Sequence, residues 1–498
     1  MSYLNAVDSA FLRMESPRTP MHVGGLMVFK LPEDAPSDYL SQLFERIRTS
    51  PVTTHPYNCR LKRGRLTGLI PEWEIAKKID IDYHVRHSAL PYPGGEKELG
   101  VLVARLHSHP LDMRRPLWEF HLIEGLENNR FALYLKAHHC AIDGMGAMRL
   151  IRQWLSEDPA SDNGYAPWSL KHAIKPAKKK KVEKKTGNVF SRTSEQLKKQ
   201  VSATTQLAKT LRTMNDREEN PEGGMYSALK TPHSLFNLPI TPQRRLATQR
   251  YDIERFERLK NATGATINDI CLSIIGAASR RYLSERDALP EEPLIASVPI
   301  GLARPDGQPG NAVAGFVCPL GTDIIDPVER VETINTITRR TKDQLQDLSK
   351  EALAQFSLLG ISPLMMAQMA GMGTRLPSFF NMVVSNVVSS KKKLYLDGAE
   401  LEAVYPISIL FDGYALNVTI VGYADCIAVG FTGCRDAIPS LQKLAVYMGD
   451  ALEELETAVF KQVPPEVKSP PKKTRKKKAA KKEALLESTD ENLEAASS

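Results

Sequence analysis

A run of basic residues near the middle of the chain sets the first limit on its fold. Residues 171–192 hold nine Lys or Arg and one acid, with few apolar side chains. A segment of low hydrophobicity and single-sign charge cannot bury a core. The sequence therefore predicts two folded domains, residues 1–165 and 237–460, joined by a basic linker and an amphipathic helix within residues 166–236. Residues 461–498 have a similar bias and are expected to form a disordered Lys-rich tail.

The positive net charge of the chain is confined to two segments. The tail run at residues 468–482 adds nine basic residues and no acid. Since the whole chain carries +8 and the two runs carry +8 and +9, the remainder carries −9. An acidic body, with no aromatic residues between the lysines, does not fit a nucleic-acid interface, which needs basic surface and stacking rings. The sequence therefore argues against nucleic acid as a partner.

Length and cysteine content favour a globular cytoplasmic protein. With 498 residues, 42% of them hydrophobic, the chain has material for roughly two to four domains. No stretch supplies the ~18 consecutive apolar residues of a spanning helix, and the first residues lack the basic and apolar regions of a signal peptide. The six cysteines include no CxxC pair, so neither a disulfide framework nor a zinc ribbon is expected.

The first half of the chain mixes strand and helix patterns. Residues 24–31 predict a strand, and so do residues 130–137, where apolar and polar or small side chains alternate. Residues 37–50 predict a helix with Ser37 as its N-cap. Residues 145–155 have helical spacing as well. Strand and helix patterns that follow one another in this way indicate a mixed α/β domain.

The second half shows the same mixture. Residues 266–283 predict a helix that begins with a Thr266 cap and has Asp269 three residues later, the pattern of a capping box. Residues 379–388 and 415–432 read as strands, the second range with a turn inside it. The second domain is therefore also expected to be a sheet flanked by helices.

One short segment carries residues suited to catalysis. Residues 137–144, Ala-His-His-Cys-Ala-Ile-Asp-Gly, stand where a strand gives way to a helix. Adjacent side chains in an extended segment point to opposite faces, so His138 and His139 cannot both face one cavity. A histidine presented at a strand end suits general-base work near neutral pH, because its unperturbed pKa is about 6.5. Gly144 fits a sharp bend, and Asp143 can hold the turn through hydrogen bonds.

Spacing alone leaves three other interpretations of this segment open. Adjacent histidines are often ordinary surface or core residues. A metal site that adds Cys140 and Asp143 to the histidine pair would require adjacent histidines to converge, which is not the spacing of tetrahedral zinc sites. A Cys140 nucleophile beside His139 is chemically reasonable, but the residues around it match no cysteine-protease signature.

The pattern HHxxxDG, read at residues 138–144, resembles the motif of the CoA-dependent acyltransferase superfamily. The surrounding segments narrow the resemblance to the bacterial wax ester synthase/acyl-CoA:diacylglycerol acyltransferase family. They follow the family's order from about residue 1 to residue 460, apart from the linker and the tail. They are LNAVDSAFLRMESPRTPMHVGGLMVF, HPLDMRRPLWEFHLIEGL, TINDICLSII, LIASVPIGL, GNAVAGFVCPL, FNMVVSNV, PISILFDGYALNVTIVGYAD and RDAIPSLQKL.

The resemblance implies an α/β (α+β) fold of two chloramphenicol acetyltransferase-like domains, with mixed sheets flanked by helices and an active-site channel between the domains. It implies that His139 is the general base, which takes the proton of an alcohol while the oxygen attacks the acyl-CoA thioester. His138 is expected to support the base and Asp143 to hold the motif loop. The implied acceptor is diacylglycerol or a long-chain alcohol, which gives triacylglycerol or wax ester. No cofactor and no metal are expected.

Further site residues follow from the same resemblance. Asn268 keeps two interpretations, a donor near the oxyanion of the reaction or a capping residue at the helix N-terminus. Trp118, Gly144 and Asn386 are expected at the substrate site, although a large aromatic such as Trp118 also fits wall and packing. The family commonly continues after the stretch Ser385-Asn386-Val387 with Pro-Gly-Pro. This chain has Val-Ser-Ser at residues 388–390, which changes the expected shape of the loop.

Because both implied substrates are lipids, the protein is expected in the cytoplasm as a peripheral protein of the inner membrane or of lipid inclusions. Residues 357–373 are rich in Met, Leu and Gly. They read either as an adaptable apolar surface or as an ordinary buried helix pair, and Pro363 argues against a continuous spanning helix. The two basic runs fit solvated spacers, nucleic-acid contacts or attraction to anionic headgroups, which is worth roughly 1 kcal/mol per Lys or Arg.

Two other functions stay open. One keeps the superfamily but changes the acceptor, for example to a polyketide or glycolipid hydroxyl. The other is a non-catalytic protein that tethers lipid bodies to membrane or DNA through the Lys-rich segments. The intact motif around His139 favours catalysis, and the opening and PLW segments favour a lipid acceptor.

Overall fold

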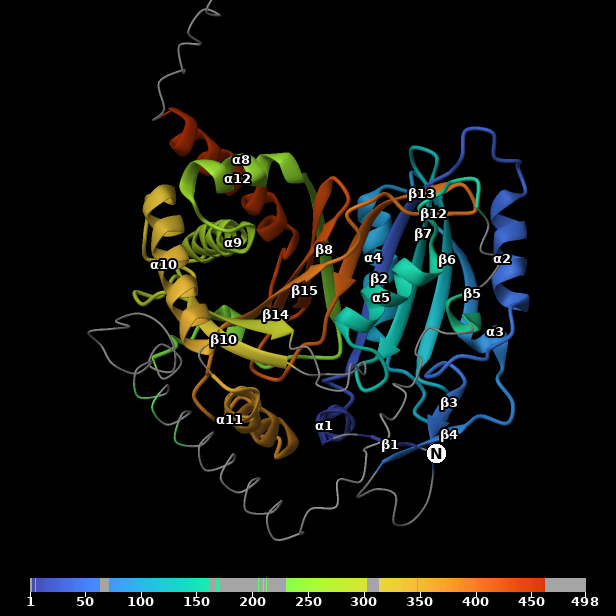
Figure 1. Ribbon diagram of the computed structural model, residues 1–498, viewed down its shortest axis with the longest axis horizontal. Helices are drawn as coiled ribbons and strands as arrows, with labels where there is room; N and C mark the ends of the chain where they lie inside the picture. The colour runs from blue at the N-terminus through green and yellow to red at the C-terminus, as the bar shows by residue number, and fades with distance from the viewer. Residues whose placement is uncertain are drawn as a thin grey trace, which may run out of the picture.

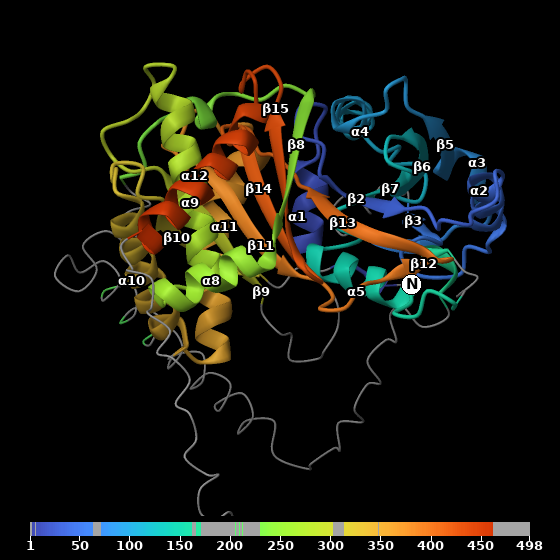
Figure 2. The same cartoon turned by 90° about the horizontal axis from the view of Figure 1, so that it is seen from above.

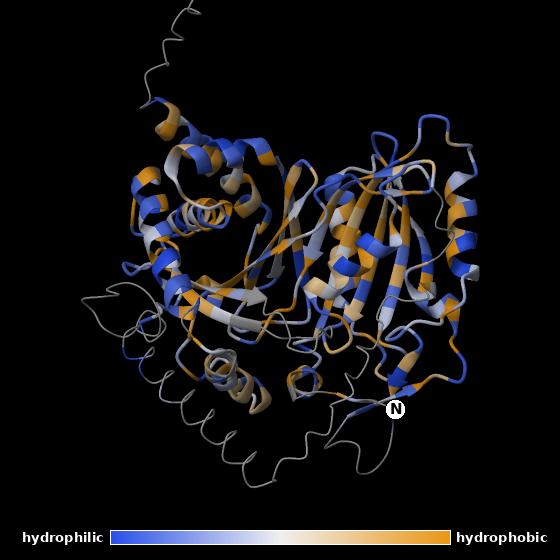
Figure 3. Cartoon of the chain, in the orientation of Figure 1, coloured by the Kyte–Doolittle hydropathy of each residue, from blue (hydrophilic) through white to orange (hydrophobic). Residues whose placement is uncertain are grey.

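The computed structural model describes residues 2–4, 6–62, 71–161, 166–170, 230–301, 313–346 and 348–461, with the isolated residues Thr205, Lys209 and Arg212. They form a mixed α/β structure built around two six-stranded sheets and one small three-stranded sheet (Figure 1). Apolar residues run along the strands of both large sheets (Figure 3). The basic linker, the amphipathic helix expected after it and the Lys-rich tail lie outside the described residues, apart from short pieces.

The first large sheet contains the strand that ends at the histidine motif. Its order is β12-β13-β2-β7-β6-β5, and neighbours are antiparallel except β5 and β6, which are parallel. β7 is buried on both faces, because α2 and α5 pack on one face and α4 packs on the other. The bounds are β2 (His22–Lys30), α2 (Tyr39–Thr49), β5 (Val85–Ala89), α4 (Glu96–Ser108), β6 (Trp118–Leu126), β7 (Arg130–His138), α5 (Gly144–Trp154), β12 (Tyr395–Leu396) and β13 (Ala399–Ile407).

The second large sheet has the order β10-β9-β11-β14-β15-β8, with β11 parallel to both of its neighbours and the other pairs antiparallel. Helices α8, α9, α10 and α12 lie on the side of this sheet that faces away from the first half (Figures 1 and 2). The bounds are β8 (Arg244–Asp252), α8 (Ile253–Thr263), α9 (Ile267–Ser284), β9 (Ile295–Gly301), β10 (Val313–Pro319), α10 (Pro327–Gln346), β11 (Met382–Val388), β14 (Leu416–Tyr423), β15 (Cys426–Cys434) and α12 (Gln442–Lys461).

The two halves are interlocked by strands that cross from one to the other. Residues 395–407, which the sequence assigns to the second domain, form β12 and β13 and pair with β2 in the first sheet. Figure 2 shows β13 extending from the region of β15 across to β2. Leu246 of β8 and Ala428 of β15 share a core with residues of α4, β2 and β7. The boundary near residue 237 therefore does not separate the two sheets.

A smaller layer lies at the N-terminal end of the chain. The sheet β1-β4-β3 lies there, and α1 and α11 contact each other beside it (Figure 1). The bounds are β1 (Ser2–Tyr3), α1 (Ala6–Met14), β3 (Cys59–Leu61), β4 (Glu72–Ile75) and α11 (Lys350–Met369). Three short helices pack elsewhere: α3 (Ile81–His84) and the 3₁₀ helix η1 (Pro167–Ser169) in the first half, and the 3₁₀ helix η2 (Leu235–Asn237) in the second.

Local signals predicted most of these elements well. The structure contains the expected strands as β2 and β7 and the expected helices as α5 and α9, and Thr266 and Asp269 form the predicted capping box. One cap is different. The residue before α2 is Asp38 rather than Ser37, and its side chain makes no capping hydrogen bond.

The Met-rich segment forms one helix end rather than a helix pair. Residues 357–369 continue α11, with Pro363 inside the helix. The side chain of Met366 is 69% exposed, and those of Met369 and Met372 are also exposed. Across the residues that the structure describes, no helix combines the length and the apolar character needed to cross a membrane.

Candidate active site

The histidine motif occupies the sharp connection between β7 and α5. β7 ends at His138, and α5 begins at Gly144. The backbone N–H of His138 donates to the carbonyl of Leu117, and that of His139 donates to the carbonyl of Met21, at 3.0 and 2.8 Å. The residues that directly precede the neighbouring strands β6 and β2 therefore hold the loop on both sides.

His139 lies in an apolar setting formed by α1. Its ring stacks on the ring of Phe11, with centroids 4.2 Å apart and planes inclined by 20°. Burial lowers the pKa of His139 to about 4, while the charge of Asp143 acts in the opposite direction. The imidazole is therefore neutral at pH 7 and can accept a proton, which is the requirement for a general base.

His138 is turned to the other side of the strand end and serves the loop. Its Nδ1 accepts a hydrogen bond from the backbone N–H of Cys140 at 3.1 Å, and its Nε2 lies 3.4 Å from Oε2 of Glu15. The same Oε2 accepts from the N–H of Met21 at 2.5 Å. Since the carbonyl of Met21 binds the N–H of His139, Glu15 and His138 together fix the backbone around the base.

The competing interpretations of the motif find little support in this geometry. Cys140 is buried, and burial raises the pKa of its thiol well above the ordinary value, so the thiolate needed for nucleophilic attack is disfavoured. Among the described residues, no group of three or more His, Cys, Asp or Glu side chains is arranged to hold a metal ion.

Asp143 is the N-cap of α5. Its Oδ1 accepts a hydrogen bond from the backbone N–H of Gly146 at 2.5 Å. A Cβ atom on residue 146 would lie 2.9 Å from that oxygen, so glycine allows the close approach. The carboxylate thus fixes the start of the helix that follows the base.

The opposite side of the site comes from the second half of the molecule. A Cβ atom on Gly144 would lie 3.8 Å from Cγ2 of Val387 on β11, so the motif loop is in contact with that strand. The preceding residue of the strand, Asn386, places its Nδ2 3.5 Å from Oδ1 of Asn268 on α9. Both amides are at least partly accessible to solvent. The structure therefore places Gly144 against β11 of the second half, and Asn386 of the same strand beside Asn268.

The capping interpretation of Asn268 is not what the structure shows. Thr266 is the N-cap of α9, with its hydroxyl bound to the N–H of Asp269 and the Asp269 carboxylate bound back to Thr266. The other carboxylate oxygen of Asp269 accepts from Thr338 at 2.7 Å. Asp269 is thus structural, whereas the side chain of Asn268 is partly exposed and lies 3.5 Å from the Asn386 amide.

Trp118 lies inside the first domain rather than at a substrate surface. Its side chain is 2% exposed and stacks between His84 and Trp168, with centroid distances of 4.4 and 4.8 Å. Its Nε1 donates to the carbonyl of Tyr57, and His84 Nδ1 is 2.7 Å from the Trp118 carbonyl. Neither face of the Trp118 ring is therefore open to a substrate, and packing is the role that fits the structure.

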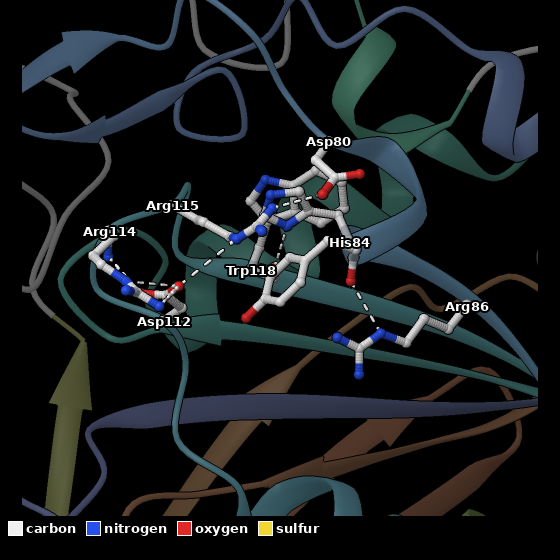
Figure 4. A network of polar contacts seen from close by, with 8 residues as sticks. Asp80, His84, Arg86, Asp112, Arg114, Arg115 and Trp118 are labelled. Atoms are coloured by element: carbon white, nitrogen blue, oxygen red, sulfur yellow. Dashed lines mark hydrogen bonds and ion pairs between the residues drawn. The ribbon is translucent and has the colours of Figure 1, made fainter.

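A surface network covers the same region (Figure 4). Arg115 binds Asp80 at 2.9 Å and lies 3.7 Å from Asp112, which also binds Arg114 through both carboxylate oxygens. Arg115 also lies 4.0 Å above the ring of Tyr83. These contacts hold the segment just before the PLW sequence over the packed Trp118.

The sequence reasoning missed three residues that contact the motif, Phe11, Glu15 and Met21. All three lie in the opening segment that carried part of the family resemblance. The available signal was that an apolar helix followed by an acid precedes the first strand, but nothing local predicts which strand end that helix reaches.

Comparison with known proteins identifies both halves. Residues 4–271 match the wax ester synthase/diacylglycerol acyltransferase catalytic domain, and residues 309–456 match the WS/DGAT C-terminal domain. A protein of Mycobacterium tuberculosis, whose name assigns it to the diacylglycerol O-acyltransferases, is 44% identical over 463 residues, covering 92% of this chain and all of the relative. O-acyltransferase WSD of Acinetobacter baylyi is 35% identical over 466 residues, covering 93% of this chain and 98% of the relative.

Solved structures agree with the family and the fold. The wax ester synthase/diacylglycerol acyltransferase of Marinobacter aquaeolei VT8 aligns with a TM-score of 0.74 at 35% identity, over 92% of this chain and all of that chain. The first condensation domain of the calcium-dependent antibiotic synthetase aligns with a TM-score of 0.57 at 18% identity, which supports the fold alone. The predicted two-domain, chloramphenicol acetyltransferase-like fold is confirmed. The chain belongs to the wax ester synthase/diacylglycerol acyltransferase family.

Proposed function

We propose that this protein is an O-acyltransferase that moves a long-chain acyl group from acyl-CoA to diacylglycerol or a long-chain alcohol, giving triacylglycerol or wax ester. The observation that carries the proposal is the neutral, partly buried His139 on a loop that contacts the second half of the molecule. The names of the relatives support the same substrates.

The reaction needs one proton transfer in each direction. His139 accepts the proton of the acceptor hydroxyl as the oxygen attacks the thioester carbonyl. The oxyanion that forms needs a hydrogen-bond donor, and the amide of Asn268 is the proposed donor. When the carbon–sulfur bond breaks, the imidazolium returns the proton to the CoA thiolate. The acyl group goes directly to the alcohol, so the reaction calls for no acyl-enzyme and no cofactor.

Thiol release from palmitoyl-CoA tests the proposal. The purified protein is assayed with hexadecanol, with diacylglycerol and with neither, and the His139→Ala variant is assayed in parallel. Release should depend on an acceptor and fall by ~10²–10⁴ in the variant, the usual contribution of a general base. His87→Gln is the matched control, because His87 is a partly exposed histidine on β5 that stacks on Phe44. Near-normal turnover in His139→Ala would refute the assignment of the base.

The acceptor is tested separately from the chemistry. A panel that adds hydrophilic and carrier-bound alcohols ranks acceptors by kcat/KM. The proposal expects diacylglycerol and long-chain alcohols to rank first. Activity confined to hydrophilic or carrier-bound alcohols would move the protein to a different acceptor class while leaving the role of His139 intact.

We also propose that the protein works in the cytoplasm at a lipid surface, either the inner membrane or a lipid inclusion. The end of α11 supports this, because Met366, Met369, Met372 and the following Leu376 are exposed apolar residues. No Asp or Glu occurs between Glu351 and Asp397, so no acid within this stretch opposes an anionic headgroup. The inner side of the same helix reaches the catalytic region, since Met365 packs against the cluster that contains Phe11 and Cys140.

Vesicle sedimentation tests this surface. The variant Met366→Gln/Met369→Gln should bind phosphatidylglycerol vesicles at least tenfold more weakly than the parent protein. Val446→Gln is the control, because Val446 is an exposed apolar residue on α12, far from this helix end in the fold. Unchanged binding by the double variant would exclude α11 as the contact. Loss of binding on removal of residues 462–498 would point to the Lys-rich tail instead.

A further inference from the structure

A buried lysine lies on the strand that carries the catalytic motif. The side chain of Lys136 is 0% exposed, and its Nζ lies 2.9 Å from Oε2 of Glu119 on β6. The two residues are direct cross-strand partners in the register of β6 and β7. Burying two charges is expensive, and such a pair is retained only where its geometry and remaining hydrogen bonds are satisfied.

All three donors of the Lys136 ammonium group have acceptors. Besides Glu119, Nζ donates to the backbone carbonyls of Leu106 and His109, each at 3.0 Å. These carbonyls lie at the C-terminal end of α4, where backbone oxygens lack helical partners and the helix dipole favours a cation. Lys136 therefore joins three elements, β6, β7 and α4, at a single atom.

Helix α4 also contacts the second half of the molecule, through β8. The backbone N–H of Arg244, at the start of β8, donates to Oγ of Ser108 at 2.9 Å. Leu246 of β8 is buried in one core with Leu99 and Val103 of α4. A displacement of the α4 C-terminus would therefore change how the second half sits against the first.

Other buried polar contacts on this face reinforce the link. Tyr134, Lys136 and His138 alternate along β7 and so point to the same side of the sheet. The Tyr134 hydroxyl lies 2.7 Å from Nδ1 of His107, and His22 Nε2 lies 2.7 Å from the His107 carbonyl. The partners of Tyr134, His22 and Lys136 are the ring of His107 and the carbonyls of Leu106, His107 and His109. All of them lie in the last turn of α4 or directly after it.

We propose that Lys136 is a positioning residue for the acyl transfer reaction: it ties the strand that presents His139 to the end of α4, and through α4 to β8 of the other half. The inference rests on the proposed function. The motif loop begins three residues beyond Lys136, and Gly144 at its end lies against β11 of the second half. An apolar side chain would fill the space, but only a group with three donors holds the carboxylate and both carbonyls together.

The test uses the double variant Lys136→Met/Glu119→Gln, which removes both charges and leaves neither ion unpaired. The control is Arg330→Met. Arg330 is also a buried cation that donates to backbone carbonyls, those of Gly321 and Ile325, but it lies in α10, in the outer layer of the second half. Each protein is assayed for kcat and for KM of palmitoyl-CoA, with activity normalised to the folded fraction from near-ultraviolet circular dichroism.

We expect kcat of the double variant to fall at least tenfold with KM changed less than twofold, because a misplacement of about 1 Å can cost ~10²-fold in rate. Arg330→Met should keep the kcat of the parent per folded molecule. Amide hydrogen exchange at the end of α4 and in β8 should rise in the double variant only. If the double variant does not fold, Tyr134→Phe replaces it, since it removes one β7–α4 contact and keeps the ring. That variant should lower kcat at least threefold.

A kcat within twofold of the parent, or an equal loss in Arg330→Met, overturns the positioning role and leaves Lys136 as a structural residue. This result differs from failure of the proposed function. If the parent protein releases no thiol with any alcohol, the proposed function fails. If the parent is active and the variant equally so, only the inference about Lys136 fails.

Discussion

Substitution of Asp143 separates two contributions that one carboxylate makes. Its Oδ1 caps α5 by accepting from the N–H of Gly146, and its charge raises the pKa of His139 against the effect of burial. Asparagine is as good an N-cap as aspartate but carries no charge, whereas alanine offers neither. A role in holding the loop therefore predicts that Asp143→Asn retains activity and Asp143→Ala does not.

The magnitude follows from the cap. Removing an N-cap side chain costs about 1 kcal/mol. If the same free energy is lost from the position of the loop after His139 in the transition state, kcat/KM should fall roughly fivefold in Asp143→Ala. The melting temperature should fall by about 2 °C or less in a chain of this length. Asp143→Asn should stay within about twofold of the parent in kcat/KM and keep its melting temperature.

The assay is acceptor-dependent thiol release with limiting palmitoyl-CoA, with melting followed by circular dichroism. Asp326→Ala is the matched control, because Asp326 accepts from the N–H groups of Val328 and Glu329 at the start of α10, away from the motif. It should lower the melting temperature by a similar amount and leave kcat/KM unchanged. Equal loss of activity in Asp143→Asn and Asp143→Ala would refute the capping argument and make the charge the main contribution.

Three other predictions concern titration and packing. Since burial lowers the pKa of His139 to about 4, the acidic limb of kcat/KM should lie near pH 4, and a limb near 6.5 would contradict its burial. His22 and His107 are buried with pKa values well below the ordinary value. The unfolded chain binds more protons there, so the free energy of unfolding in urea should be constant above about pH 6.5 and decline as the pH falls. Gly276→Ala should cost about 3 kcal/mol by urea titration, because its Cβ would lie 2.0 Å from a backbone oxygen, whereas Gly449→Ala, with 3.8 Å of clearance, should not destabilise.

Local sequence patterns predicted what depends on local physics. The capping box of α9 needs only Thr266 and Asp269, three residues apart, and it forms as expected. The start of α5 at Gly144 follows from a strand pattern, a turn residue and helical spacing within about twenty residues of sequence. The start of α2 differs from the prediction by one residue, and the Asp38 carboxylate accepts from Nε2 of Gln42 instead of capping the helix.

Other features depend on partners distant in sequence. Nothing within residues 395–407 indicates that they pair with β2 rather than with β14, because strand patterns specify a face and not a neighbour. Trp118 was expected at the substrate site, yet its ring is enclosed by Trp168, fifty residues further along the chain. The position of Phe11 against His139 was beyond sequence reasoning for the same reason.

Burial of His139 has two opposite effects on catalysis: it lowers the basicity of the imidazole, and it keeps water away from the reaction. Burial that lowers its pKa to about 4 makes the imidazole a weaker base than a solvent-exposed histidine. A site open to water, however, would let a water molecule take the place of the alcohol and hydrolyse the thioester. The apolar ring of Phe11 on one side excludes water, and the charge of Asp143 restores part of the basicity that burial removes. Substitution of Phe11 by a small residue would therefore raise the pKa of His139 while giving water access to it, and the rate of hydrolysis without an alcohol, rather than the rate of transfer, is the quantity that should respond most.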